Sequence, residues 1–201
     1  MKKILIKNGT LIDGSREKRY DADLLIEGDK IVKIGEINEE VDRVIDATGK
    51  IVAPGFIDTH SHSDLKVLVE PFIEPKLRQG ITTEVLGQDG ISMAPLPKEY
   101  VSSWRKNLAG LDGDSDELSW DWENTDNYLN LIAKTGTGPN QLYLVPHGNI
   151  RMEAMGLEAR PATKEERLEK QRAEKQEQEE RQYNLKIDGK DYQGGGMFTH
   201  P

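Results

Sequence analysis

The sequence predicts an α/β protein made of three successive segments: a small β domain over residues 1–52, alternating strands and helices over residues 53–163, and a charged helical tail over residues 164–201. Short apolar runs separated by turn residues predict the first segment. Apolar, strand-like runs that alternate with helical patterns predict a parallel sheet in the second. A run of charged residues with almost no apolar positions marks the third.

Composition limits the possible partners. The net charge of −9 argues against binding to nucleic acid or to an anionic membrane, which needs clustered positive charge. With no cysteine, the fold has neither disulfides nor thiolate metal ligands, which fits the cytoplasmic location that we expect. The apolar run before Lys7 is too short for the core of a signal peptide, and no stretch is long enough to span a membrane.

The first segment reads as short strands with a structural role. A turn at Asn8-Gly9 is expected to end the first strand, and a turn at Asp13-Gly14 to end the second. Gly28 and Asp29 are expected to form the turn of a hairpin. The strands are predicted at residues 4–6, 10–12, 23–26 and 31–34.

The stretch Ile51–Asp64 organises the rest of the chain. Its first apolar residues predict a strand covered on both faces, and polar chemistry follows abruptly. Because side chains alternate along a strand, Asp58, His60 and His62 are expected on one face. Two neighbouring imidazoles suit a divalent metal, although a bare His-x-His also occurs by chance on exposed strands and turns.

Residues 46–62 resemble the N-terminal metal-binding segment of the amidohydrolase superfamily. The resemblance implies a small β domain followed by the first strand of a (β/α)₈ TIM-type barrel, with both histidines at the carboxyl end of that strand. The resemblance also implies one or two Zn²⁺ ions as the cofactor, and other divalent metals are possible. Since only about three barrel strands have matches here, the expected fold is a β domain followed by an incomplete barrel.

A second barrel strand is predicted at residues 81–87, after a helix at residues 72–80. Its Gly-Ile-Thr-Thr run resembles the N-acyl-D-amino-acid deacylases, the group that contains D-aminoacylase. Asp89 stands where several members of that group have a cysteine that bridges two metals. A carboxylate can also bridge two divalent ions, so Asp89 is a candidate ligand. The alternative is an Asp-Gly turn residue that binds nothing.

The region between the second and third strands contains two predicted helices, at residues 99–108 and 126–134, and three tryptophans. Trp104, Trp120 and Trp122 could line a substrate cleft. We favour the interpretation that they fill the core, as buried tryptophans more often do.

A third strand at residues 141–145 ends in His147 and Arg151. The deacylase group carries a His-Gly with a nearby arginine at this place. Arg151 is a candidate to pair with the carboxylate of an N-acyl amino acid, and His147 to hydrogen-bond the acyl oxygen or a metal-bound water. Both could equally be residues that pack the loop.

The tail has helical propensity over residues 164–182 and favourable charge pairs, but no apolar face to bury. Family members have an apolar stripe on the corresponding helix. Gly194–Gly196 reads as a flexible linker, and His200 is not expected to bind metal because it lies at the terminus.

The resemblance implies a metal-dependent hydrolase of amide C–N bonds that acts on small N-acyl amino acids. In amidohydrolases the catalytic aspartate comes from the eighth strand and further histidines from the fifth and sixth, so no catalytic residue is assigned in this chain. We expect a truncated or N-terminal portion that is weakly active or inactive alone, with a missing C-terminal portion or an oligomer as possible complements. The alternatives are a hydrolase of cyclic amides such as a hydantoinase or dihydroorotase, an inactive relic, and an interaction protein that uses the charged helix.

Overall fold

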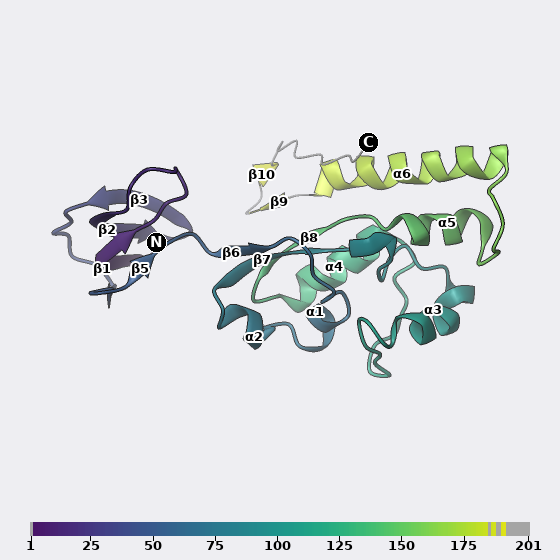
Figure 1. Ribbon diagram of the computed structural model, residues 1–201, viewed down its shortest axis with the longest axis horizontal. Coiled ribbons are helices and arrows are strands. Elements are labelled where there is room, and N and C mark those ends of the chain that lie inside the picture. Colours follow the sequence, from purple (N-terminus) through teal and green to yellow (C-terminus); the bar gives the residue numbers. More distant parts are fainter. Residues whose placement is uncertain (1, 185, 188–189, 192–201) are drawn as a thin grey trace. The chain divides into compact units, whose positions relative to one another are not determined.

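The computed structural model describes residues 2–184, 186–187 and 190–191 (Figure 1). The chain divides into two compact units, Met1–Gly55 and Phe56–Pro201, where the sequence predicts a first boundary at residue 52 and a separate tail from residue 164. The predicted linker Gly194–Gly196 and His200 lie outside the described residues. Within those residues, every helix is too short or too polar to cross a bilayer.

The first unit is a five-stranded sheet in the order β3-β2-β1-β4, with β5 also paired to β1. The predicted hairpin is confirmed: β2 and β3 pair antiparallel around Gly28, whose φ of 63° suits a glycine. A small core of Leu5, Leu25 and Ile37 lies against the sheet. The strands are β1 (Lys3–Leu11), β2 (Tyr20–Glu27), β3 (Lys30–Gly35), β4 (Arg43–Asp46) and β5 (Ile51–Val52).

The prediction of two strands separated at Asn8-Gly9 is wrong, since β1 continues through both residues. Asn8 has a φ of 62°, and the pairing with β2 shifts register between Ile6 and Gly9. The turn-type residues therefore form a bulge inside one strand. Gly9 is needed for close packing as well, because a Cβ atom there would lie 2.5 Å from Cγ2 of Val52.

The second unit contains the predicted parallel sheet, in the order β6-β7-β8. Its strands are β6 (Phe56–Asp58), β7 (Ile81–Leu86) and β8 (Asn140–Tyr143). Its helices are α1 (Lys66–Val69), α2 (Glu74–Leu77), α3 (Val101–Leu108), α4 (Thr125–Thr135), α5 (His147–Met155) and α6 (Lys164–Asn184), with single 3₁₀ turns η1 (Gln88–Gly90) and η2 (Lys98–Tyr100). The short strands β9 (Lys186–Ile187) and β10 (Lys190–Asp191) pair antiparallel after α6.

One face of the three-stranded sheet is covered and the other is open. Leu86 and Tyr143 are paired across β7 and β8, and both are buried in the core with Tyr128 of α4. Side chains at the alternate positions point to the opposite face. On that face Ile57 is 60% exposed and Leu142 is 55% exposed.

The stretch from Ile51 onward therefore differs from the single buried strand that the sequence predicts. Ile51 and Val52 form β5 in the first sheet, whereas Phe56 begins β6 in the second. Pro54 and Gly55 separate the two strands. Phe56 is 64% exposed. An apolar pattern predicts a strand but does not specify which elements cover it.

The helices predicted before the third strand agree with the structure to different degrees. The helix predicted at residues 126–134 is α4, which Asn124 caps by accepting a hydrogen bond from the Asn127 backbone N–H. The helix predicted at residues 72–80 is reduced to α2 and a following turn that ends at Gly80. The core interpretation of the three tryptophans is confirmed, since Trp104, Trp120 and Trp122 are all buried.

The predicted charged helix is α6, which lies along α5 (Figure 1). It begins with a reciprocal capping box. The Glu166 backbone N–H donates a hydrogen bond to Oγ1 of Thr163, and the Thr163 backbone N–H donates one to Oε2 of Glu166. Arg160 pairs with the same carboxylate. These contacts fix the start of α6 although Leu168, its apolar residue near the start, is half exposed.

Candidate metal centre

Three predicted site residues follow the three parallel strands at the same edge of the sheet. His60 comes after β6, Asp89 after β7 and His147 after β8. Since the carboxyl ends of parallel strands meet at one edge, the turns that follow them lie close together.

His60, His62 and Asp89 converge on one point. Oδ2 of Asp89 lies 3.3 Å from Nε2 of His60 and 3.1 Å from Nε2 of His62. The ring centroids are 5.4 Å apart, with an interplanar angle of 62°. Two imidazole nitrogens and a carboxylate oxygen facing one another form a donor set that fits zinc or a similar divalent ion.

The local backbone of the β7–η1 turn places the Asp89 carboxylate. Asp89 has a φ of 56°, a left-handed conformation that aspartate tolerates better than most residues. Gly87 and Gly90, on either side, are left-handed as well. The turn and the ligand interpretations of Asp89 are therefore compatible, and its role as a ligand stays a prediction.

The alternation along residues 58–63 holds for the histidines but not for Asp58. β6 ends at Asp58, whose carboxylate lies 2.9 Å from Nζ of Lys76, a contact that lowers the pKa of Asp58. Asp58 is thus directed to a lysine on α2 rather than to the histidine pair.

A buried polar group lies on the side of the strand away from the histidines. Glu84, which is fully buried on β7, accepts hydrogen bonds of 3.2 Å from the hydroxyls of Ser61 and Ser63. Lys76 forms an ion pair with the same carboxylate. These bonds anchor the residues that alternate with His60 and His62, and the sequence offered no specific signal for them.

Two buried aspartates lie on the other side of His62. Nδ1 of His62 is 3.7 Å from Oδ1 of Asp112, whose side chain is 1% exposed. Burial, together with the neighbouring Asp64 charge, raises the pKa of Asp112 to about 7. Burial likewise raises the pKa of Asp64, which accepts hydrogen bonds from the Gly87 N–H and the Ser92 hydroxyl. Sequence reasoning missed both residues, although the position of Asp64, two residues after His62, could have suggested it as a candidate.

His147 lies close to the Asp89 turn. It begins α5, where the sequence predicts a loop, and a Cβ atom on Gly90 would lie 3.8 Å from its Cβ. Its Nδ1 is 2.7 Å from Nζ of Lys170 on α6. The structure thus brings His147 to the loop that carries a candidate ligand, while its role with substrate is untested.

Arg151 is engaged elsewhere. Its guanidinium donates hydrogen bonds to the backbone carbonyls of Glu158 and Arg160, at 2.9 and 2.7 Å, and contacts Sδ of Met155. These bonds tie the end of α5 to the loop that follows it. In this conformation Arg151 therefore packs a loop, which is the second of the two interpretations that the sequence leaves open.

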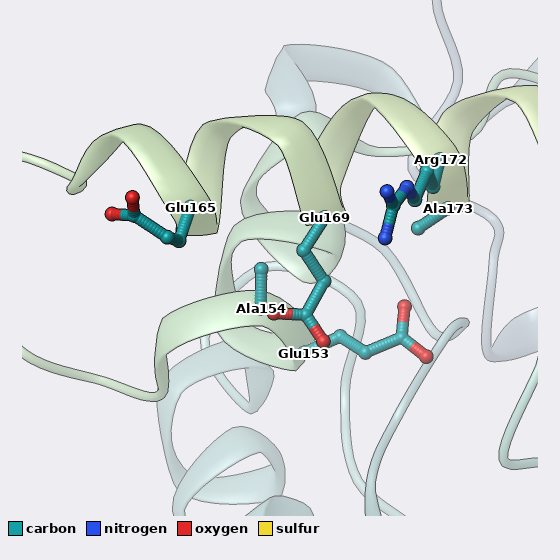
Figure 2. Close-up of a pocket in the computed structure, with 6 residues that line it drawn as sticks. All are labelled: Glu153, Ala154, Glu165, Glu169, Arg172 and Ala173. Carbon is teal, nitrogen blue, oxygen red and sulfur yellow. The ribbon is translucent and has the colours of Figure 1, made fainter.

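A groove of about 510 Å³ lies between α5 and α6, and none of the predicted site residues lines it (Figure 2). Carboxylates and one guanidinium dominate its surface. It is lined by Glu153, Ala154, Glu165, Glu169, Arg172 and Ala173. Three carboxylates, one guanidinium and two alanine methyl groups give no specific ligand chemistry.

Comparison with known proteins identifies the family of this chain. The profile of the Amidohydrolase family matches residues 43–180. D-aminoacylase of Alcaligenes xylosoxydans xylosoxydans is 37% identical over 164 residues, which cover 81% of this chain and 33% of that protein. The N-acyl-D-glutamate deacylase of the same organism is 40% identical over 166 residues, 82% of this chain and 33% of that protein.

Two solved structures resemble the chain closely. The N-acyl-D-glutamate deacylase of Bordetella bronchiseptica, in complex with zinc and a phosphonate inhibitor, superposes with a TM-score of 0.72 and 34% identity over 85% of this chain and 35% of that one. A D-aminoacylase with a binuclear metal centre gives a TM-score of 0.71 and 32% identity over 83% and 34%. The chain spans about a third of the length of the curated relatives it matches. The family profile spans the end of the first unit and most of the second, including both histidines and Asp89, so the chain belongs to the amidohydrolase family.

Proposed function

We propose that this chain forms the N-terminal metal-binding part of a hydrolase that cleaves the amide C–N bond of N-acyl amino acids. The observation that carries the proposal is the convergence of His60 and His62 on one oxygen of Asp89, at the carboxyl edge of a parallel sheet. Relatives that are 37 and 40% identical over most of this chain are a D-aminoacylase and an N-acyl-D-glutamate deacylase.

His60, His62 and Asp89 would hold the metal, for which we propose Zn²⁺. When bound, such an ion polarises an amide carbonyl and lowers the pKa of a coordinated water. The two imidazoles supply neutral nitrogen ligands, and the carboxylate of Asp89 supplies a charge and a second oxygen that can reach a second ion. A neighbour that contains zinc and another with a binuclear centre support one or two ions.

We further propose that the second unit is the first part of a (β/α)₈ barrel. The open sheet face carries the apolar residues Ile57 and Leu142, and the interior of a barrel is packed with side chains of this kind. The helices α1 and α4 contact each other and take part in the core on the opposite face, as an outer helical layer would.

For the substrate we propose a linear N-acyl amino acid. The alignments with deacylases favour it over a cyclic amide. His147 can reach an acyl oxygen only if Lys170 leaves room at its ring, and Arg151 can pair with a carboxylate only after releasing the carbonyls of Glu158 and Arg160. An interaction role for the charged helix has less support, because α6 packs against α5.

The test measures zinc binding and hydrolysis of N-acetyl-D-amino acids by the 201-residue chain. We expect weak zinc binding that depends on both histidines, and little or no turnover, because two histidines and one carboxylate fall short of a complete catalytic set. Robust turnover by this chain, or zinc binding that survives loss of both histidines, would overturn the proposal.

A further inference from the structure

The His62 ring has two nitrogens with different environments. Nε2 faces Oδ2 of Asp89 at 3.1 Å, on the side where His60 also points. Nδ1 faces Oδ1 of Asp112 at 3.7 Å. One nitrogen is thus directed to the candidate metal point and the other to a buried carboxylate.

Asp112 has no other evident structural use. Neither of its carboxylate oxygens has a hydrogen-bond donor within bonding distance among the residues that the structure describes, and both are inaccessible to solvent. Leaving a buried carboxylate without hydrogen-bond donors is strongly unfavourable in general. Such a cost points to a partner that engages Asp112 in the working protein.

Asp64, the other buried carboxylate, is held in place by the scaffold. Its Oδ1 accepts the Gly87 N–H at 2.9 Å and the Ser92 hydroxyl, and its backbone carbonyl accepts the Tyr128 hydroxyl at 2.6 Å. These bonds fix the backbone at Asp64, two residues after His62. Oδ2 of Asp64 is buried and has no hydrogen-bond partner among the described residues either, but Asp112 is the carboxylate that lies 3.7 Å from Nδ1 of His62.

We propose that Asp112 is a positioning residue for the metal site: it accepts the Nδ1 proton of His62 and so holds the ring with Nε2 free for the metal. Metal-binding histidines usually donate their second ring nitrogen to a carboxylate or carbonyl, which fixes the tautomer and raises the basicity of the ligand nitrogen. The present separation of 3.7 Å is longer than a formed N–H···O bond, so the proposal requires the ring and the carboxylate to approach each other when the metal binds. The inference rests on the proposed function, because it requires His62 to be a ligand.

The informative variant is Asp112→Asn, which keeps the shape and removes the charge. A residue with only a structural role would change stability and leave the metal site alone. If Asp112 is a positioning residue, we expect zinc affinity to fall roughly 10–100-fold. Thermal stability should be unchanged or increased, because a buried charge beside Asp64 is removed. Asp116→Asn in the same loop, where the aspartate is exposed, is the matched control with unchanged affinity.

The tautomer of His62 can be measured by NMR spectroscopy without any metal. Long-range ¹H–¹⁵N correlation of the metal-free chain at pH 8 reports which nitrogen of His62 carries the proton. We expect the Nδ1–H tautomer in the parent chain and a shift toward Nε2–H, the usual form in water, in Asp112→Asn. The His60 signals serve as the internal control.

The outcomes separate the two proposals. If the parent chain binds no zinc, or binds it independently of His60 and His62, the proposed function fails. If zinc binds through these histidines but Asp112→Asn changes neither the affinity nor the His62 tautomer, the positioning role fails and the proposed function stands. If the parent chain binds two zinc ions and Asp112→Asn loses one, a cation occupies the pocket of His62, Asp64 and Asp112, and the positioning role is again overturned.

Discussion

The backbones of Gly90 and Gly148 pack against each other so closely that a Cβ atom on Gly148 would lie 2.7 Å from the Gly90 carbonyl oxygen. Gly90 follows Asp89 in the turn after β7, and Gly148 follows His147 at the start of α5. This contact joins two candidate parts of the site that are far apart in sequence. A side chain on Gly148 must therefore displace the turn that carries Asp89 or the helix that carries His147.

Gly148→Ala tests this contact. Alanine favours a helix over glycine, so propensity alone predicts stabilisation, whereas the clash predicts a loss of roughly 1–3 kcal/mol in the free energy of unfolding. Urea denaturation measures the loss, and zinc titration should show weaker binding. Gly110→Ala is the control, because a Cβ atom there meets nothing within 4 Å. Equal stability of the two variants would contradict the close approach.

Lys76→Met should be strongly destabilising. It leaves the fully buried carboxylate of Glu84 without its cation, and breaking a buried pair in this way costs about 3–5 kcal/mol. The double variant Lys76→Met/Glu84→Gln should recover a large part of the loss in a denaturation experiment. Lys66→Met, which removes an exposed i,i+4 pair with Glu70, should cost no more than about 1 kcal/mol. Similar losses for the two lysine variants would refute the buried role of Lys76.

The start of α6 should depend on pH through Glu166. Its pKa is lowered to about 2, chiefly by hydrogen bonding to Arg160, from an ordinary value of 4.5. A lowered folded-state pKa means that the ionised carboxylate stabilises the fold fully above pH 4.5, and that this stabilisation is lost as the pH falls toward 2.

Amide hydrogen exchange at the first turn of α6 measures this effect, once corrected for the intrinsic pH dependence of exchange. Protection should fall between about pH 4.5 and pH 2 in the parent chain, and Glu166→Gln should remove most of that dependence. Glu165→Gln is the neighbouring control and should leave the pH profile intact. A profile that is the same for parent and Glu166→Gln would contradict the assignment.

Asp89→Cys should strengthen zinc binding. Thiolate is a softer ligand than carboxylate and suits zinc well, so we expect an affinity increase of about tenfold, equivalent to ~1.4 kcal/mol. Asp89→Asn, which tolerates the same left-handed φ of 56°, should weaken binding because the charge is lost. Isothermal titration with zinc measures both variants. No difference between asparagine and aspartate at this position would remove Asp89 from the ligand set.

Regular patterns predicted several elements of the fold and the meeting of three candidate ligands, whose role as ligands stays a prediction. Helix α4 and the β2–β3 hairpin follow from periodicity and turn chemistry, and the meeting of Asp89 with the two histidines follows from the common edge of parallel strands. Asp112 lies in an irregular loop, so no periodic signal connects it to His62. Arg151 was a reasonable substrate ligand by residue type, but the carbonyls that engage it depend on how the chain turns after α5.

The apolar residues of β6 show a different limit. Phe56 and Ile57 carry the pattern of a strand covered on both faces, yet both are exposed. Periodicity records which residues favour burial, whereas burial itself depends on the elements that pack against them. The open face is consistent with the proposed barrel of which this chain would be the first part.

Zinc titration of the 201-residue chain and of its His60→Ala/His62→Ala variant is the decisive experiment for the metal centre. We expect one or two weakly bound ions per parent chain and no binding by the variant, with circular dichroism showing that both are folded alike. Undiminished zinc binding by a folded variant would contradict the assignment of this edge of the sheet as the metal centre.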